Sequence, residues 1–311
     1  MLGIYKPYKP IYTNRQYNND MVNYSGAIDT ITDFAKDYQD VVVLSNLDGK
    51  YQLDNYHNKL DEIVLFCGVH AKDPAGEDIF KKLRDLTDRL IYINDDINLY
   101  PSNMKLLDYA DEIYSYSSSK IFDFLPELEN KFHTISPLLS VYPQYLRYSN
   151  VSLPSYRDRN IEVFYGGTEG DSKRFAGILE FVIRPEVVFK LKSRRLNLDN
   201  RVPHFNLDSY LERTKYTILL ADENMYNFNF VTTRFFEYAM RGVFTVAHRD
   251  FDAMNIETPN TVPRVNSYLE FYKIIHETTP EYWVKRTSEW RSYINMKAYD
   301  LKKQIISIVK P

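Results

Sequence analysis

The chain has 311 residues, of which 44% are hydrophobic and 26% are charged, a balance typical of a folded protein and not of a disordered one. The net charge of −3 argues against a general polyanion-binding protein, and the single cysteine, Cys67, excludes an internal disulfide. No apolar run reaches the roughly 20 residues that span a bilayer, so we expect no membrane partner. A single cysteine fits the reducing cytoplasm. The sequence leaves the oligomeric state open, and a monomer is favoured.

The charges are distributed unevenly along the chain. Residues 1–150 hold 15 basic and 22 acidic residues, whereas residues 151–311 hold 24 basic and 20 acidic residues. A mildly basic second half suits a phosphorylated small molecule. The 27 tyrosines suit stacking on bases or sugars, although the codon usage of an AT-rich genome explains the larger share of them.

The first half alternates apolar, β-rich runs with amphipathic helical patterns, which is typical of parallel sheets covered by helices. Helices are expected at 26–38 and 76–89, and strands at 40–45, 62–68, 89–94 and 112–117. Cys67 lies in one of these apolar runs, where it reads as a small buried hydrophobic residue. Residues 140–160 contain prolines and have no clear period, which indicates a linker between domains.

A second series of the same kind follows. Its expected strands are 161–167, 187–192, 216–222 and 243–248, its expected helices are 172–183 and 232–242, and the tail forms one or two helices. The predicted fold class is therefore α/β, with two Rossmann-like domains facing across a cleft. The domains are predicted at 1–150 and 151–280, followed by a helical segment at 281–311 that returns to the first domain.

Ligands of open parallel sheets bind beyond the carboxyl ends of the strands, and the stretch "VFYGGTEGDSKR" begins at such an end. Gly166 and Gly167 let backbone N–H groups approach a phosphate, and Lys173 or Arg174 would add a full charge. The alternative, glycines that serve only the geometry of the turn, is favoured by this motif on its own.

The stretch "TTRFFEYAMRG" reads as a short helix with a candidate N-cap at Thr232 or Thr233 and a terminating Gly242. One face carries Phe235, Phe236, Ala239 and Met240, and the other carries Arg234, Glu237, Tyr238 and Arg241.

A cation in the first turn opposes the helix dipole, so an anion in front of the helix explains Arg234 better. Glu237 could then accept two ribose hydroxyls, and Asp222, at the preceding strand end, could bind a sugar. An ordinary surface ion pair between Arg234 and Glu237 is the alternative.

The stretch "YINDDINLYP" places Asp95 and Asp96 at another strand end, in the first domain. A carboxylate there could act as a general base on an acceptor hydroxyl, although adjacent acids are also common in loops. The stretch "RDFD" at 249–252 resembles a metal-binding pair of aspartates, but we interpret it as a loop and predict no metal site.

These blocks, together with "LLADENMYNFNFVTTRFFEYAMRGVFTVAHRDFD", resemble the DNA β-glucosyltransferases of T-even phages over roughly residues 90–275. That family has the GT-B fold and moves glucose from UDP-glucose to hydroxymethylcytosine in DNA, inside the host cytoplasm. The resemblance implies a UDP-sugar donor, a DNA acceptor carrying a hydroxymethylated pyrimidine, and Mg²⁺ or Mn²⁺ only as a stimulating ion. In this chain the resemblance implies that Arg174 and Arg234 bind the diphosphate, that Glu237 binds the ribose and that Asp222 binds the sugar. It implies a general base at Asp96, with Asp95 next in line. Further contacts to the donor are expected from Gly166, Gly167, Thr168 and Lys173.

The chain departs from the family at three points. Gly170 stands where the family has a second phosphate-binding arginine, and Lys173 is the candidate to compensate. A family glutamate that contacts the sugar falls near Ser25 or Gly26, and one residue is inserted between Asp222 and Arg234. These departures concern the sugar and the acceptor and leave the fold unaffected.

Contacts to DNA are expected from two basic stretches. The stretch "YKPYKPIYTNRQY" interleaves Lys6, Lys9 and Arg15 with tyrosines from Tyr5 onward, which suits phosphate contact and base stacking, and a structured Tyr- and Pro-rich loop is the equal alternative. Arg194 and Arg195 form the second stretch.

Two other functions stay open on the sequence. One is a GT-B transferase acting on a glycan, cell-surface or spore acceptor, and the other is a non-catalytic nucleotide-sugar or DNA-binding protein. An NAD-dependent oxidoreductase is disfavoured because no G-x-G-x-x-G follows a strand.

Overall fold

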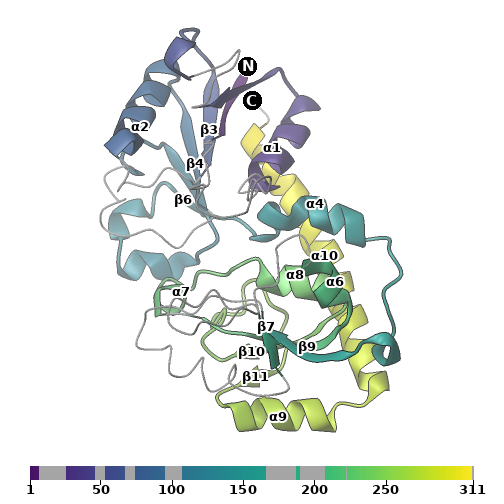
Figure 1. Ribbon diagram of the computed structural model, residues 1–311. Helices are drawn as coiled ribbons and strands as arrows, with labels where there is room; N and C mark the ends of the chain where they lie inside the picture. Colours follow the sequence, from purple (N-terminus) through teal and green to yellow (C-terminus); the bar gives the residue numbers. More distant parts are fainter. Residues whose placement is uncertain are drawn as a thin grey trace. The chain divides into compact units, whose positions relative to one another are not determined.

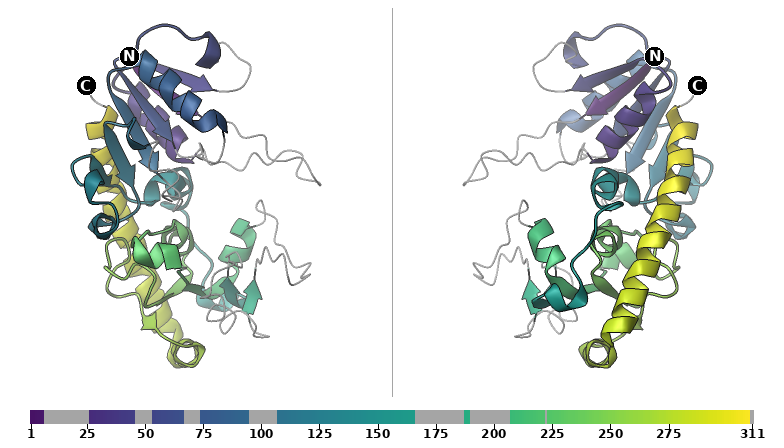
Figure 2. Two further views of the ribbon diagram at one scale, coloured as in Figure 1. Left: turned by 90° about the vertical axis from the view of Figure 1, so that its left-hand side faces the viewer. Right: turned by 90° about the vertical axis from the view of Figure 1, so that its right-hand side faces the viewer.

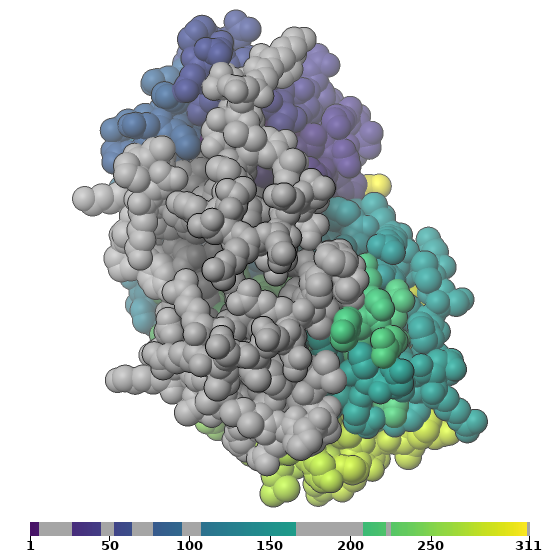
Figure 3. Space-filling view, viewed as in Figure 1, coloured from purple at the N-terminus to yellow at the C-terminus, as the bar shows by residue number. Residues whose placement is uncertain are grey.

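The computed structural model describes residues 1–6, 26–45, 53–66, 74–94, 107–165, 187–189, 207–221 and 223–309, which are coloured in Figure 3. The chain forms two compact units (Figure 1). The first unit contains Met1–Pro143 and Ala298–Pro311, and the second contains Gln144–Lys297. The sequence placed the corresponding boundaries at 150 and 280.

The first unit is built on a six-stranded parallel sheet with the order β2-β1-β3-β4-β5-β6. The strands are β1 (Leu2–Lys6), β2 (Val41–Ser45), β3 (Glu62–Phe66), β4 (Leu90–Asn94), β5 (Glu112–Ser115) and β6 (Phe132–Thr134). The four predicted strands are confirmed as β2 to β5. Strands β1 and β6 were not predicted, and the three residues of β6 are too few to show a period.

Strand β1 lies between β2 and β3, and its Leu2, Ile4 and Tyr5 side chains are fully buried. The expectation that Tyr5 stacks on bases is therefore wrong. Its ring fills the core because strands in the interior of a parallel sheet are covered on both faces. Lys6 ends the strand, and Lys9 and Arg15 lie outside the described residues.

Helices α1 (Gly26–Lys36) and α2 (Pro74–Leu86) confirm the two helices predicted in the first half. Helix α4 (Leu138–Tyr148) corrects the predicted linker, because it continues through Pro143. Leu138, Leu139, Val141 and Tyr142 of this helix are buried, and its packing outweighs the one backbone hydrogen bond that a proline forfeits. Short 3₁₀ turns complete the described connections at η1 (Leu53–Asn55), η2 (Ser119–Asp123), η3 (Pro126–Leu128) and η4 (Tyr156–Asp158).

The tail forms one continuous helix, α10 (Pro280–Val309), which contributes to both units (Figure 2). Its last part belongs to the first unit, as predicted. There Gln39 Nε2 donates to the Val309 carbonyl oxygen at 2.6 Å, and Lys302 Nζ lies 5.7 Å from the centre of the Phe34 ring. Among the described helices, none has the combination of length and hydropathy needed to cross a membrane.

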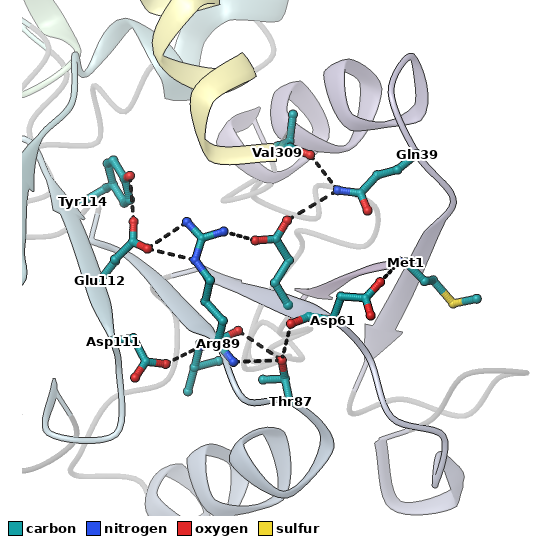
Figure 4. Close-up of polar contacts among 11 residues, drawn as sticks. Met1, Gln39, Asp61, Thr87, Arg89, Asp111, Glu112, Tyr114 and Val309 are labelled. Carbon is teal, nitrogen blue, oxygen red and sulfur yellow. Dashed lines mark hydrogen bonds and ion pairs between the residues drawn. The ribbon is translucent and has the colours of Figure 1, made fainter. Parts of the chain in front are cut away.

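An ionic cluster closes the amino edge of the first sheet (Figure 4). Arg89, just before β4, pairs with Glu62 at the start of β3 and with Glu112 at the start of β5. Gln39 donates to Glu62 as well as to the end of α10. This cluster ties the C-terminal helix to the sheet on the side opposite the carboxyl ends of the strands.

The second unit is built on a five-stranded sheet with the order β11-β10-β9-β7-β8, and its strand pairs are parallel. The strands are β7 (Ile161–Tyr165), β8 (Val187–Phe189), β9 (Thr214–Leu219), β10 (Phe244–His248) and β11 (Arg264–Val265). The described helices before α10 are α6 (Leu207–Glu212), α7 (Glu223–Asn227), α8 (Arg234–Met240) and α9 (Tyr268–Glu277). The four strands predicted here are confirmed, and the two-residue β11 was missed.

A buried arginine holds the amino side of this sheet together. The Arg159 guanidinium donates to the carbonyl oxygens of Leu211, Thr214 and Arg241 at 3.0, 2.7 and 2.8 Å, and it stacks on Trp283. Burial lowers the pKa of Arg159 to about 10. The guanidinium thus joins α6, β9 and the end of α8.

Gly242 ends α8, as predicted. The N–H groups of Gly242 and Val243 donate to Ala239 and Tyr238, both at 3.0 Å, in a Schellman arrangement. Gly242 has φ = +69°, which favours glycine. A Cβ atom here would lie 2.8 Å from Leu153 Cδ1.

We therefore expect Gly242→Ala to reduce the free energy of unfolding by about 1–2 kcal/mol, because it adds left-handed strain and a close contact. Urea unfolding followed by circular dichroism measures the change. An unaltered midpoint would mean that the turn relaxes without cost.

Candidate active site

The carboxyl edge of the second sheet gathers the described candidates. Strands β7, β9 and β10 are neighbours and run parallel, so Tyr165, Leu219 and His248 end at the same edge. Helix α8 follows β9 through α7 and residues 228–233. Its first residue, Arg234, lies over Tyr165, with Cζ 5.9 Å from the ring centre. The cation therefore sits where open parallel sheets bind their ligands.

Arg234 is part-buried and has no acidic partner at close range among the described residues. Within the described ranges, no carboxylate oxygen comes within ion-pair distance of its guanidinium. Burial opposes the charged form, but Tyr165, Tyr238 and Glu237 outweigh it and raise the pKa of Arg234. The side chain is thus a permanent cation, held by an aromatic ring and available to an anion.

Glu237 lies one turn further along α8. Arg234 and Glu237 form no ion pair with each other, so the surface-pair alternative does not describe this helix. Thr233 precedes the helix, but its side chain accepts no capping hydrogen bond. Instead, its hydroxyl donates to Glu237 Oε1 at 3.2 Å. The carboxylate keeps acceptor capacity for further hydroxyl groups.

The opposite side of α8 differs from the prediction. Phe235, Phe236, Ala239 and Met240 are buried as expected, but Tyr238 and Arg241, assigned to the polar face, are buried as well.

Arg241 forms an ion pair with Asp208 of α6, donates to Gln144 Oε1 at 3.1 Å and lies over the Tyr148 ring. The prediction assumed a helix that packs through one apolar face only. A helix that is covered on two sides also buries residues outside that face. Arg241 therefore anchors α8 and does not face a ligand.

Two polar residues just before α8 were not among the predicted site residues. The Thr232 hydroxyl oxygen and Asn229 Nδ2 are buried and have no hydrogen-bond partner in the part of the chain that the structure describes. The local sequence pattern does not reveal buried side-chain atoms without a hydrogen-bond partner, because the surrounding fold decides whether a partner is present.

The carboxyl edge of the first sheet carries a buried polar pair. Asn94 and Ser115 are register partners at the ends of β4 and β5, and Asn94 Nδ2 donates to Ser115 Oγ at 3.3 Å. The Ser117 backbone N–H donates to the same oxygen at 3.3 Å. Asp95 and Asp96 come directly after Asn94 in the sequence, and both lie outside the described residues.

The other predicted residues of the donor and DNA sites also lie outside the described ranges, and their roles stay predictions. They are Gly166, Gly167, Thr168, Lys173, Arg174, Asp222, Arg194 and Arg195. Two described residues locate the start of these segments. Tyr165, the last residue of β7, directly precedes Gly166, and Ala221, two residues after the end of β9, directly precedes Asp222.

The loop interpretation of residues 249–252 is confirmed. Asp252 is buried at φ = +46°, and its carboxylate accepts the backbone N–H groups of Ile256, Glu257 and Thr258 at 3.0, 2.9 and 2.7 Å. This carboxylate is therefore used within its own loop. Over the described ranges, no group of three or more His, Cys, Asp or Glu side chains is placed to hold a metal ion.

No protein-family model matches the sequence, and no curated protein sequence matches it. Similarity appears among solved structures. A T4 phage β-glucosyltransferase (BGT) in complex with its substrate UDP-glucose superposes with a TM-score of 0.70 at 13% identity, over 100% of both chains. The chain has the GT-B fold. This agrees with the predicted fold class.

Two further solved structures have the same fold. A DNA-modifying β-glucosyltransferase, solved with and without uridine diphosphoglucose, gives a TM-score of 0.67 at 13% identity, over 100% of both chains. HepE from Anabaena in complex with UDP-glucose gives 0.60 at 12% identity, over 99% of this chain and 98% of the other. This chain thus shares its fold with proteins of very different sequence.

Proposed function

We propose that the protein is a glycosyltransferase that moves glucose from UDP-glucose to the hydroxymethyl group of a modified pyrimidine in DNA. The GT-B fold supports the reaction class, and the solved structures of this fold that bind UDP-glucose support the donor. The similarity to a DNA-modifying enzyme over the whole chain supports the acceptor.

The observation that carries the proposal is Arg234. A guanidinium at the carboxyl edge of a parallel sheet, over Tyr165 and without an ion-pair partner among the described residues, suits a diphosphate. Charge develops on that diphosphate as the bond to the sugar breaks. A fixed cation at this place stabilises the leaving group in the transition state.

The proposed reaction is a direct displacement. Asp96 accepts the proton of the acceptor hydroxyl, whose oxygen bonds to the anomeric carbon as the bond to the diphosphate breaks and UDP leaves. One in-line attack inverts the configuration of that carbon. Arg174 and Lys173 share the diphosphate with Arg234, Gly166, Gly167 and Thr168 line it, and Asp222 binds the sugar. In this scheme Mg²⁺ or Mn²⁺ would serve only as a stimulating ion, without a dedicated site on the protein.

The test is calorimetric binding of UDP, UDP-glucose and other UDP-sugars, followed by transfer of labelled sugar to DNA. The acceptors are duplexes carrying hydroxymethylcytosine, hydroxymethyluracil or no modification, and a mixture of bacterial glycans. Transfer of label to the hydroxymethylated duplexes supports the proposal. Transfer to the glycans alone would mean that the acceptor is a glycan and not DNA. Binding without transfer indicates a non-catalytic relative, and no nucleotide binding overturns the proposal.

Glu237→Gln tests the nucleoside end of the site. The glutamine keeps the oxygen that accepts from Thr233 but loses the charge, so we expect about fivefold to tenfold weaker UDP binding. The wild type should also prefer UDP to 2′-deoxy-UDP, and the variant should lose most of this preference. An equal preference in both proteins would place the ribose elsewhere. Calorimetry with the two nucleotides gives the comparison.

A further inference from the structure

The segment between Asn229 and Arg234 contains a hydroxyl group for which the described part of the chain offers no partner. Thr232 Oγ1 is buried and makes no hydrogen bond within the described ranges. Its neighbour Thr233 has a similar side chain, but the Thr233 hydroxyl donates to Glu237. A buried polar atom without a partner has lost its hydrogen bonds to water without compensation, so each such atom in a native structure needs an explanation, of which a bound ligand is one.

The segment is anchored on both sides of Thr232. On one side Asn229 is almost fully buried at φ = +42°, and its Oδ1 accepts the Met254 N–H at 3.3 Å. That bond orients the amide and leaves Nδ2 as a second buried donor without a partner in the described chain. On the other side Arg241 fixes α8 through its ion pair with Asp208. The backbone that carries Thr232 is therefore held at both ends.

The anchors also locate the segment on the sheet. Asn229 contacts the loop that follows β10, and Arg234 lies over Tyr165 at the end of β7. Because β9 lies between β10 and β7, residues 229–234 cross the carboxyl edge of the sheet at the end of β9. The free hydroxyl thus lies in the stretch that leads directly to the cation.

We propose that Thr232 is a further donor-binding residue, whose hydroxyl hydrogen-bonds an oxygen of the diphosphate beside Arg234. This inference rests on the proposed function for the identity of the ligand. A phosphate group offers several acceptor oxygens, so a guanidinium and a neutral hydroxyl two residues apart can bind it together. Rotation about the Cα–Cβ bond of the part-buried Thr232 turns the hydroxyl toward the ligand.

The test uses three variants. Thr232→Val removes the hydroxyl at constant shape, Thr232→Ser keeps it, and Thr233→Val is the matched control for a hydroxyl that is already bonded. We expect Thr232→Val to weaken UDP binding about fivefold to tenfold in calorimetry, with Thr232→Ser within about twofold of the wild type. Binding of uridine, which has no phosphate, should not change in Thr232→Val.

Thermal unfolding without ligand separates this role from a structural one. Thr232→Val should keep or raise the unfolding midpoint, because it removes an unpaired buried group, whereas Thr233→Val should lower it. A lower midpoint for Thr232→Val, or unchanged UDP affinity, would overturn the inference.

If the wild type binds no UDP, the proposed function fails, and pyrophosphate becomes the probe. A midpoint raised by pyrophosphate in the wild type but not in Thr232→Val would still support a phosphate site at Thr232. The absence of both effects would overturn both proposals.

Discussion

Replacing Arg234 by Ala is expected to weaken UDP binding by about 1.5–3 kcal/mol, roughly 10- to 150-fold in Kd. The guanidinium lies over Tyr165 and makes no ion pair with the described carboxylates, so the loss is that of a charge-assisted contact to the ligand. The loss should be confined to the phosphates, and uridine should bind both proteins equally. Calorimetry with UDP and uridine measures both.

Two further variants sharpen this experiment. Arg234→Lys keeps the charge but loses the planar fork, so its affinity should fall between those of Ala and the wild type. Arg213→Ala is the matched control, because this exposed arginine lies at the amino edge of the sheet. Its Nε donates a hydrogen bond to Oδ1 of Asn160, the residue just before β7, at 2.9 Å. The Arg213→Ala variant should bind UDP as the wild type does. If Arg234→Ala binds UDP with unchanged affinity while remaining folded, Arg234 is not in the site.

Asp96→Asn is expected to reduce turnover by a factor of order 10² or more and to leave UDP-glucose binding nearly intact. The amide has the shape of the carboxylate but cannot accept the proton of the acceptor hydroxyl. Single-turnover transfer to the preferred acceptor measures the rate, and calorimetry measures donor affinity. The configuration of the transferred sugar, read by NMR, should be inverted relative to the donor.

The matched control is Asp95→Asn, which removes the same charge one residue earlier. We expect it to retain most of the activity. Full activity in Asp96→Asn together with a large loss in Asp95→Asn would mean that Asp95, and not Asp96, is the general base. Loss of donor affinity in Asp96→Asn would instead assign this carboxylate to the donor.

Several features followed from local pattern. Apolar runs alternating with helical periods indicated two parallel sheets, and eight of the strands were placed within a few residues. The helix around Arg234 was predicted together with its terminating Gly242, because a left-handed position after a helix selects glycine on local grounds. The location of Arg234 at a carboxyl edge followed from the order of strand and helix alone.

Other features depended on which segments meet in space. Strand β1 was not predicted because its five residues run directly into a Lys- and Tyr-rich stretch. Only its pairing with β2 and β3 shows that Tyr5 belongs to the core. The helix through Pro143 was not predicted either. Its apolar period is short, and whether it forms depends on the packing of its buried side chains.

The sequence by itself determined the order of strands and helices, the fold class and the helix that presents Arg234 and Glu237. Only the tertiary structure decided that Arg241 is buried against Asp208 and that the Thr232 hydroxyl has no partner among the described residues. Secondary structure depends on periods of a few residues, which are written in the sequence. Burial and hydrogen-bond pairing depend on neighbours that are distant along the chain, and a local pattern contains no information about them.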